Sequence, residues 1–254
     1  MSRALNATGR PIFYNVCEWG IRQPWEWARG IANSWRTTPD IVASFLDGYG
    51  SSHSIANIVA ANEKTWPHAG PGGWNDPDLL QAGLPGVSDA EGRAQFSLWA
   101  AMKAPLLINA DLTALSAATL ATLSNPEVIA VNQDPLGVQA RRVRQTVDFA
   151  AGAVDVWAGP LAGGDLVALL FNQGNPGTKA KDVALRWEDL GLAPGARARV
   201  RDLWARRDLG EFAGGFERAV APHDCMVLRV TPLGGAASAR DWGDPRARAP
   251  VDLQ

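Results

Sequence analysis

The pattern of hydrophobic and polar residues changes once along the chain. Up to about residue 138, short apolar runs alternate with stretches of helical periodicity. This alternation predicts a parallel β-sheet with helices packed outside it, in about four strand-helix units. The strand-like runs cover residues 12–17, 104–108 and 128–131, and the helical stretches cover residues 25–32, 47–63, 91–103 and 117–123. Residues 1–10 have the pattern of the last turns of a helix that Gly9 ends, which indicates either a preceding region or a short exposed N-terminal helix.

Beyond Gln139 the runs become shorter and richer in β-branched and aromatic residues, with Gly, Asn and Pro turns between them. They cover residues 142–149, 154–157, 166–172, 183–187, 198–203, 217–220 and 225–230. This spacing predicts an antiparallel all-β domain, a sandwich. Residues 233–254 are rich in Gly, Ala, Pro and Arg and indicate a loose tail. The predicted organisation is therefore an α/β region (1–138), a β-sandwich (139–232) and a tail (233–254).

Composition narrows the classes of function. The 254 residues include 24 basic and 26 acidic side chains, a balance that argues against a nucleic-acid partner. No apolar run approaches the roughly 20 residues that cross a bilayer, which argues against a membrane protein. Two cysteines, Cys17 and Cys225, cannot build a disulfide framework. The 11 tryptophans suit either sugar stacking or a core.

Three segments carry candidate chemistry, and the first two place a carboxylate beside aromatic or basic groups. Glu18 and Trp19 follow the strand predicted at residues 12–17, where a parallel α/β fold builds its site. The alternative is a loop carboxylate near a core tryptophan. In the second segment, Trp35, Arg36 and Asp40 supply an apolar face, a fork of donors and a titratable group. The alternative for Asp40 is the N-cap of the following helix.

The third segment crowds Asn75, Asp76 and Asp78 into four positions after a glycine-rich turn. Two other interpretations are an Asx turn and a calcium loop, although the ligand spacing does not match an EF-hand. The three histidines are scattered without metal-ligand spacing, so no metal site is predicted.

Read in order, these segments resemble the melibiase-type α-galactosidases of glycoside hydrolase family 27. The resemblance covers about residues 1–232. Its motifs are GRPIFYNVCEWG (9–20), NSWRTTPDI (33–41), AGPGGWNDPDLL (69–80), FSLWAAMKAPLLINADL (96–112), NPEVIAVNQDPLGVQ (125–139), VRDLWARRDLGEF (200–212) and VAPHDCMVLRV (220–230). Ordered motifs at family-like spacing are far more specific than any one of them alone.

The resemblance implies a (β/α)8 barrel followed by an antiparallel β-sandwich, and hydrolysis of terminal α-galactosyl residues with retention by two carboxyl groups. It makes Asp40 the acid/base and Arg36 a sugar contact beside that acid. Glu18 and Trp19 correspond to the loop near the galactose 2-hydroxyl, and Glu18 favours galactose over N-acetylgalactosamine. Asp78 corresponds to a residue lining the sugar pocket. No cofactor is implied.

No segment matches the family's nucleophile motif or its aspartate pair for the 4- and 6-hydroxyls. We therefore expect residues 1–138 to correspond to the C-terminal half of the barrel, strands five to eight. The resemblance also implies that Cys17 is a free thiol. A half barrel leaves edge strands and apolar surface uncovered, and the isolated chain should lack α-galactosidase activity.

Two alternatives remain open at this point. One is a carbohydrate-binding or structural remnant that stacks Trp19, Trp35 and Trp74 on sugar, and the other is a complementing half barrel. The latter would pair with a separate N-terminal half or with a second copy of itself.

Overall fold

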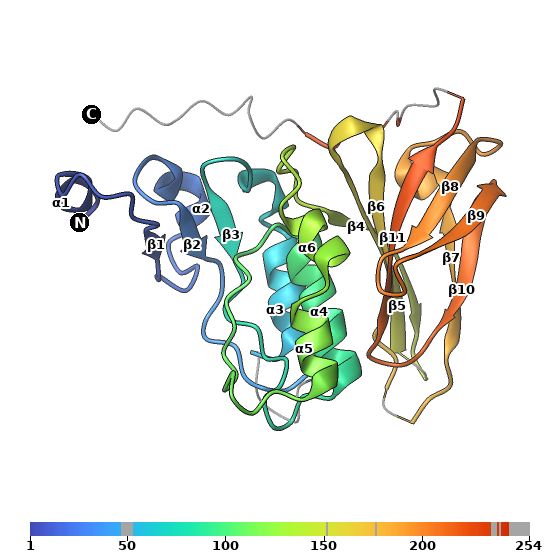
Figure 1. Cartoon of the computed structure of the whole chain (residues 1–254), viewed down its shortest axis with the longest axis horizontal. Helices are drawn as coiled ribbons and strands as arrows, with labels where there is room; N and C mark the ends of the chain where they lie inside the picture. The colour runs from blue at the N-terminus through green and yellow to red at the C-terminus, as the bar shows by residue number, and fades with distance from the viewer. Residues whose placement is uncertain (47–52, 151, 176, 235–237, 239, 244–254) are drawn as a thin grey trace.

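The computed structural model describes residues 1–46, 53–150, 152–175, 177–234, 238 and 240–243. The helices and short strands of the first half of the chain lie beside a β domain formed by the second half (Figure 1). The coarse prediction of an α/β region followed by an antiparallel β region is confirmed.

Three short strands form the parallel sheet. They are β1 (Asn15–Val16), β2 (Ser34–Arg36) and β3 (Trp74–Asp76), in the order β1-β2-β3. Beyond β3, a parallel bridge joins Leu80 to Ile108, and the Leu80 amide donates to the Leu107 carbonyl at 2.8 Å. The predicted strand at 104–108 is therefore reduced to this one bridge, because no second strand pairs with it among the described residues.

Serine and asparagine caps set the starts of the helices from α3 to α6. The helices are α1 (Ser2–Asn6), α2 (Pro24–Trp27), α3 (Ile55–Glu63), α4 (Asp89–Ala101), α5 (Ala117–Leu123) and α6 (Pro126–Asn132), with 3-10 turns η1 (Ala28–Gly30) and η2 (Trp66–His68). Ser54 caps α3, and Ser88 caps α4 in a capping box with Glu91. The predicted helix at 47–63 is confirmed from Ile55 onward, while its positions 47–52 lie outside the described residues.

The prediction of a strand at residues 128–131 is wrong, because these residues belong to α6. Asn125 accepts bonds from the amides of Glu127 and Val128, and Pro126 occupies the first turn. Val128 and Val131 are both buried, and their three-residue spacing places them on one face of a helix.

The β domain consists of two antiparallel sheets. Its elements are β4 (Arg141–Asp148), β5 (Gly152–Pro160), β6 (Leu166–Asn172), β7 (Lys181–Arg186), β8 (Arg197–Asp202), β9 (Arg207–Ala213), β10 (Gly215–Val220) and β11 (Cys225–Pro232), with the turns η3 (Ala162–Gly164) and η4 (Trp187–Leu190). The larger sheet has the order β4-β5-β6-β11-β8-β9, and β10 pairs with β7. Each predicted run corresponds to a strand. Strand β9 was not predicted separately, because its residues are mostly exposed and give little apolar pattern.

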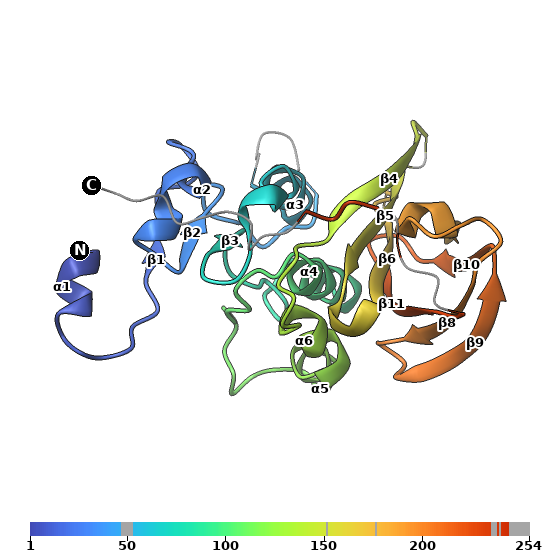
Figure 2. The same cartoon turned by 90° about the horizontal axis from the view of Figure 1, so that it is seen from above.

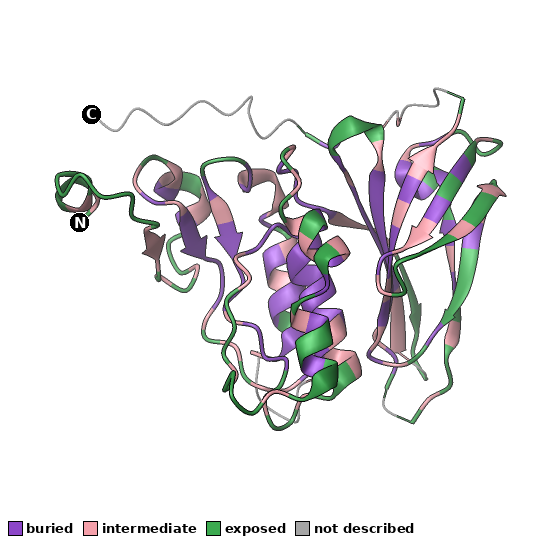
Figure 3. Cartoon of the chain, viewed as in Figure 1, coloured by how far each residue is buried: buried purple, intermediate pink, exposed green. Residues whose placement is uncertain are grey.

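Two apolar cores hold the chain together (Figure 3). In the first, Trp99 of α4 packs with Phe171 of β6 and Val227 of β11, so that α4 lies against the large sheet. The second fills the space between the two sheets of the β domain and includes Trp187. Seen from above, α3 and α4 lie between the parallel strands and the β domain (Figure 2). Fully burying a large apolar side chain contributes about 1.5–3 kcal/mol, so this shared core joins the two parts firmly.

The described residues near the C-terminus are attached more closely than a loose tail implies. Ser238 donates to the Leu190 carbonyl at 2.6 Å, and Trp242 is buried in the second core. The Arg141 guanidinium lies over the rings of both Trp66 and Trp242, at 4.4 and 5.5 Å from their centroids. These contacts attach Ser238 and Trp242 to the packed structure.

Candidate active site

Arg36, the last residue of β2, is the centre of a charged cluster at the carboxyl ends of the parallel strands. Its Nη2 lies 2.7 Å from Asp78 Oδ2 and 3.0 Å from Asp40 Oδ1. The same nitrogen donates to the Thr38 carbonyl at 3.2 Å. The structure thus brings together three of the five site residues named from the sequence.

Asp78 is buried and its carboxylate is fully engaged. Besides Arg36, Oδ2 accepts the Ile41 amide at 2.9 Å, and Oδ1 accepts the Leu79 amide at 2.8 Å. The Asp78 backbone has φ 82°, a region that costs a non-glycine residue energy, and the Asp78 amide donates to Asp76 Oδ1 at 2.8 Å. This last bond is the Asx turn that the sequence left open as an alternative.

Asp40 is the exposed carboxylate of the cluster. Its side chain is 67% accessible, whereas those of Arg36 and Asp78 are 9% accessible. The alternative role as a helix N-cap does not hold, because Ser54 caps α3. Asp40 is therefore a carboxylate held in place by one arginine and open to a ligand on its other side.

Asp76 is a site residue that the sequence did not single out from its neighbours. It is paired with Arg36 in the register between β3 and β2, so both side chains lie on one face of the sheet. Asn15 Nδ2 on β1 donates to Asp76 Oδ2 at 2.6 Å. Burial raises the pKa of Asp76, against the opposing effects of the Asp78 amide and Arg36. The parallel register, and not a motif, identifies this residue.

Glu18 and Trp19 lie on the loop after β1. Glu18 Oε1 accepts the Arg22 amide at 2.7 Å, while Oε2 is buried and has no hydrogen-bond partner among the described residues. Trp19 has φ 60° and is 45% exposed, so it is not a core tryptophan. Cys17, which precedes Glu18, is exposed and forms no disulfide, and its Sγ lies 3.9 Å from Arg36 Nη1. This contact links the loop to the cluster.

The interpretation of Trp35 as a residue that stacks on sugar is wrong. Its ring is fully buried and its Nε1 donates to Asn75 Oδ1 at 2.9 Å. Trp35 alternates with Ser34 and Arg36 along β2, so its side chain lies on the opposite face of the sheet from the cluster. It cannot stack on a sugar.

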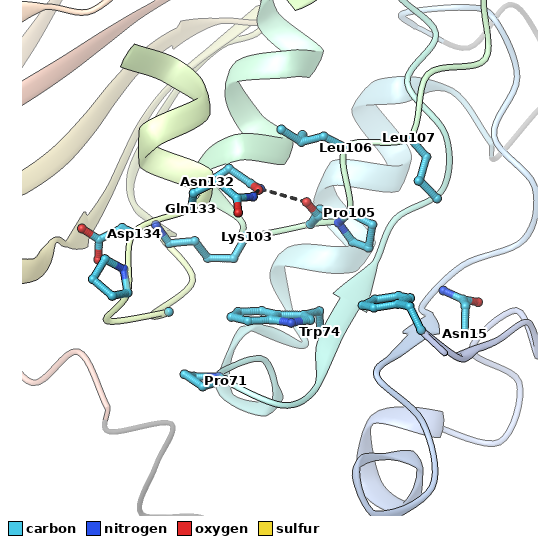
Figure 4. Close-up of a pocket in the computed structure, with 14 residues that line it drawn as sticks. Asn15, Pro71, Trp74, Lys103, Pro105, Leu106, Leu107, Asn132, Gln133 and Asp134 are labelled. Carbon is cyan, nitrogen blue, oxygen red and sulfur yellow. Dashed lines mark hydrogen bonds between the residues drawn. The ribbon is translucent and has the colours of Figure 1, made fainter. Parts of the chain in front are cut away.

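A cavity of about 800 Å³ opens on the same face of the sheet as Asp76 (Figure 4). Asn15, Trp74 and Lys103 line it together with Phe13 and Leu107, which are 62% and 51% exposed. Lys103 is itself buried and donates to the Val131 carbonyl, and burial lowers its pKa to about 8. The cavity therefore combines apolar walls with a buried amine, and Asp134, which also lines it, opposes the lowering of that amine's pKa.

Two further kinds of feature are absent from the described residues. No group of three or more His, Cys, Asp or Glu side chains there is arranged to hold a metal ion. None of the helices in that part of the chain has both the length and the apolar character to cross a bilayer.

Comparisons with known proteins fit this arrangement of a parallel α/β region followed by an antiparallel β domain. The sequence model of the family described as "Alpha galactosidase A" matches residues 1–134, and that of the "Alpha galactosidase C-terminal beta sandwich domain" matches residues 151–230. The chain belongs to the α-galactosidase A family.

Curated relatives and a solved structure that the chain resembles are named alpha-galactosidases. The chain is 47% identical over 234 residues to "Alpha-galactosidase 3" of Arabidopsis thaliana, covering 91% of this chain and 51% of that protein. It is 42% identical to an alpha-galactosidase of Cyamopsis tetragonoloba, covering 53% of that protein. The crystal structure of alpha-galactosidase I from Mortierella vinacea superposes with a TM-score of 0.85 at 31% identity, covering 94% of this chain and 62% of that one. The chain thus spans about half the length of the curated relatives it matches.

Proposed function

We propose that this chain carries the acid/base half of a retaining α-galactosidase site, with Asp40 as the acid/base. The observation that carries the proposal is the exposed Asp40 carboxylate, held at 3.0 Å by Arg36 at a strand end of an α-galactosidase family fold. Asp40 would protonate the leaving glycosidic oxygen and then take a proton from water. The hydrolysis of terminal α-D-galactosyl residues needs no cofactor in this scheme.

The second carboxyl group of a retaining site must stand about 5–5.5 Å from the first and attack the sugar. Asp78 shares Arg36 with Asp40, but both of its oxygens accept hydrogen bonds from its own chain. We propose that the nucleophile comes from another polypeptide segment, and that these 254 residues alone do not turn over substrate. Asp78, with Glu18 and Trp19, would instead shape the sugar pocket, with Glu18 excluding an acetamido group at the galactose 2-position.

The parallel strands fit the same scheme. We propose that residues 1–138 supply the last four strands of a (β/α)8 barrel and residues 139–232 its β-sandwich. Phe13, Leu107 and Ile108 are exposed on or beside the uncovered part of the sheet, where further strands would pack. A complementing N-terminal half barrel, or a second copy of this chain, would cover them.

Turnover of an aryl α-galactoside tests the proposal. The purified chain should be inactive, and co-expression with the first half of the Arabidopsis thaliana relative should give an active assembly that Asp40→Asn abolishes. Turnover by the chain alone would refute the need for a second carboxyl group. A stable assembly without turnover, or with turnover unaffected by Asp40→Asn, would refute the role of Asp40.

A second candidate is a carbohydrate-binding module that acts without hydrolysis. The exposure of Trp19 favours it, since an open indole face can stack on a sugar ring. Titration calorimetry would then show a heat of binding when galactose is added to the isolated chain, and Trp19→Ala would remove that heat. Absence of heat at millimolar galactose would leave only the catalytic role.

A further inference from the structure

The segment that follows Asp40 is fixed at both ends. The Ile41 amide donates to Asp78 Oδ2 at 2.9 Å, which ties its start to the charged cluster. At its far end, the carbonyls of Ser44 and Phe45 accept the amides of Ile55 and Ala56 at 2.9 and 3.1 Å. These two amides belong to the first turn of α3, whose donors have no partner inside the helix. The segment 41–46 therefore links the candidate acid/base to the start of α3.

Phe45 connects this segment to the β domain. Its ring is buried and stacks on the His223 imidazole, with ring centroids 4.2 Å apart and planes at 27°. It also meets the edge of Phe171 of β6 at 6.0 Å and 75°. Both partners come from the β domain, more than a hundred residues away in the sequence. The position of Phe45 is thus set by the β domain as well as by α3.

His223 is itself held rigidly. Its amide donates to the Asn172 carbonyl at 2.8 Å, and its Nδ1 lies 2.6 Å from Oε1 of Glu91 in the first turn of α4. Its backbone has φ 58°, a strained conformation that the surrounding contacts must maintain. Beside it, Arg93 of α4 pairs with Asp224 through Nε at 3.0 Å and through a second nitrogen. The imidazole is therefore a fixed platform at the junction of α4, β6 and β11.

We propose that His223 and Phe45 are positioning residues, through which the β domain sets the place of segment 41–46 and so of Asp40, which directly precedes it. The role for catalysis rests on the proposed function of Asp40, whereas the mechanical coupling does not. In this scheme the β domain is part of the active-site architecture: removing the ring stack frees segment 41–46, and the Asp40 carboxylate loses its fixed distance to Arg36.

Hydrogen exchange on the full chain tests the coupling. The variants are Phe45→Leu, which removes the ring but keeps apolar bulk, and His223→Asn, since asparagine tolerates a positive φ. The matched control is Phe212→Leu, which breaks the aromatic pair with Phe216 at 5.1 Å within the β domain. Exchange of the Ile41, Ile55 and Ala56 amides, each divided by that of Leu169 in β6, should rise roughly two- to tenfold in both variants and stay unchanged in the control.

An unchanged ratio in the two variants would overturn the coupling, and because the ratio is internal, a general loss of stability does not mimic the effect. The catalytic consequence is tested in the complemented assembly described above. There, Phe45→Leu and His223→Asn should lower kcat severalfold with little change in KM, because an acid/base acts on the transition state. A changed exchange ratio with unchanged kcat would keep the coupling but remove its catalytic role. Failure of Asp40→Asn to abolish turnover would separately remove the proposed function.

Discussion

Arg36 Nη2 lies 2.7 Å from Asp78 Oδ2, and this buried ion pair joins the carboxyl ends of β2 and β3. The same nitrogen holds Asp40, whose side chain faces solvent. The cluster therefore combines a structural pair with an exposed carboxylate. The two parts should respond differently to substitution.

Arg36→Met should destabilise the chain by about 3–5 kcal/mol, because it leaves the buried Asp78 carboxylate without its cation. Urea unfolding at pH 7 measures the loss. The control is Arg197→Met, which breaks the exposed pair with Glu211 and should cost about 1 kcal/mol or less. Similar losses in the two variants would show that the Arg36 pair contributes no more than a surface pair.

Asp40→Asn should leave the free energy of unfolding within about 0.5 kcal/mol of the parent, because its side chain is largely exposed. Asp78→Asn should cost about 3 kcal/mol, since it removes a buried charge beside Arg36 and replaces an oxygen that accepts an amide. Parallel urea titrations compare the two. A large loss in Asp40→Asn would mean that this residue has a structural role.

Lys103 should make stability depend on pH in the alkaline range. Burial lowers its folded-state pKa to about 8, below the unfolded value of about 10.4, so the unfolded chain binds more protons between these values. The cost of burying the charge is full below pH 8 and is relieved as the pH rises. Relative to that of Lys103→Met, the free energy of unfolding of the parent should rise by on the order of 2 kcal/mol between pH 7.5 and 9.5.

The control for this experiment is Lys64→Met, at an exposed position at the end of α3, which should follow the parent's pH dependence. At pH 7, Lys103→Met should also be more stable than the parent, because no charge is then buried. Identical pH profiles for Lys103→Met and the parent would contradict the lowered pKa.

The exposed apolar residues beside the cavity should drive self-association. The double variant Phe13→Ser/Leu107→Ser should reduce the apparent mass in size-exclusion chromatography with light scattering, because it removes apolar surface from the uncovered sheet. Phe149→Ser is the matched control, since Phe149 is also exposed but lies at the β4–β5 hairpin. Equal effects from both substitutions would indicate association without a preferred face.

Periodicity located most of the elements correctly. Turn residues and β-branched runs identified strands such as β6 (Leu166–Asn172), and the boundaries of α5 (Ala117–Leu123) match the predicted residues. It failed at residues 128–131, where an apolar run fits a strand or one face of a helix equally well. It also missed β2 (Ser34–Arg36) and β3 (Trp74–Asp76), because these short strands of polar and aromatic residues give no apolar run.

The sequence by itself determined the family and the order of the α/β and β regions, and it singled out the candidate side chains Glu18, Arg36, Asp40 and Asp78, because these depend on residue types at fixed spacing. Only the tertiary structure decided that Asp78 is buried while Asp40 is open, that Trp35 faces the core, and that His223 supports Phe45. Burial and long-range contacts depend on which distant elements pack together. That packing is a property of the whole fold, which no local pattern of residues contains.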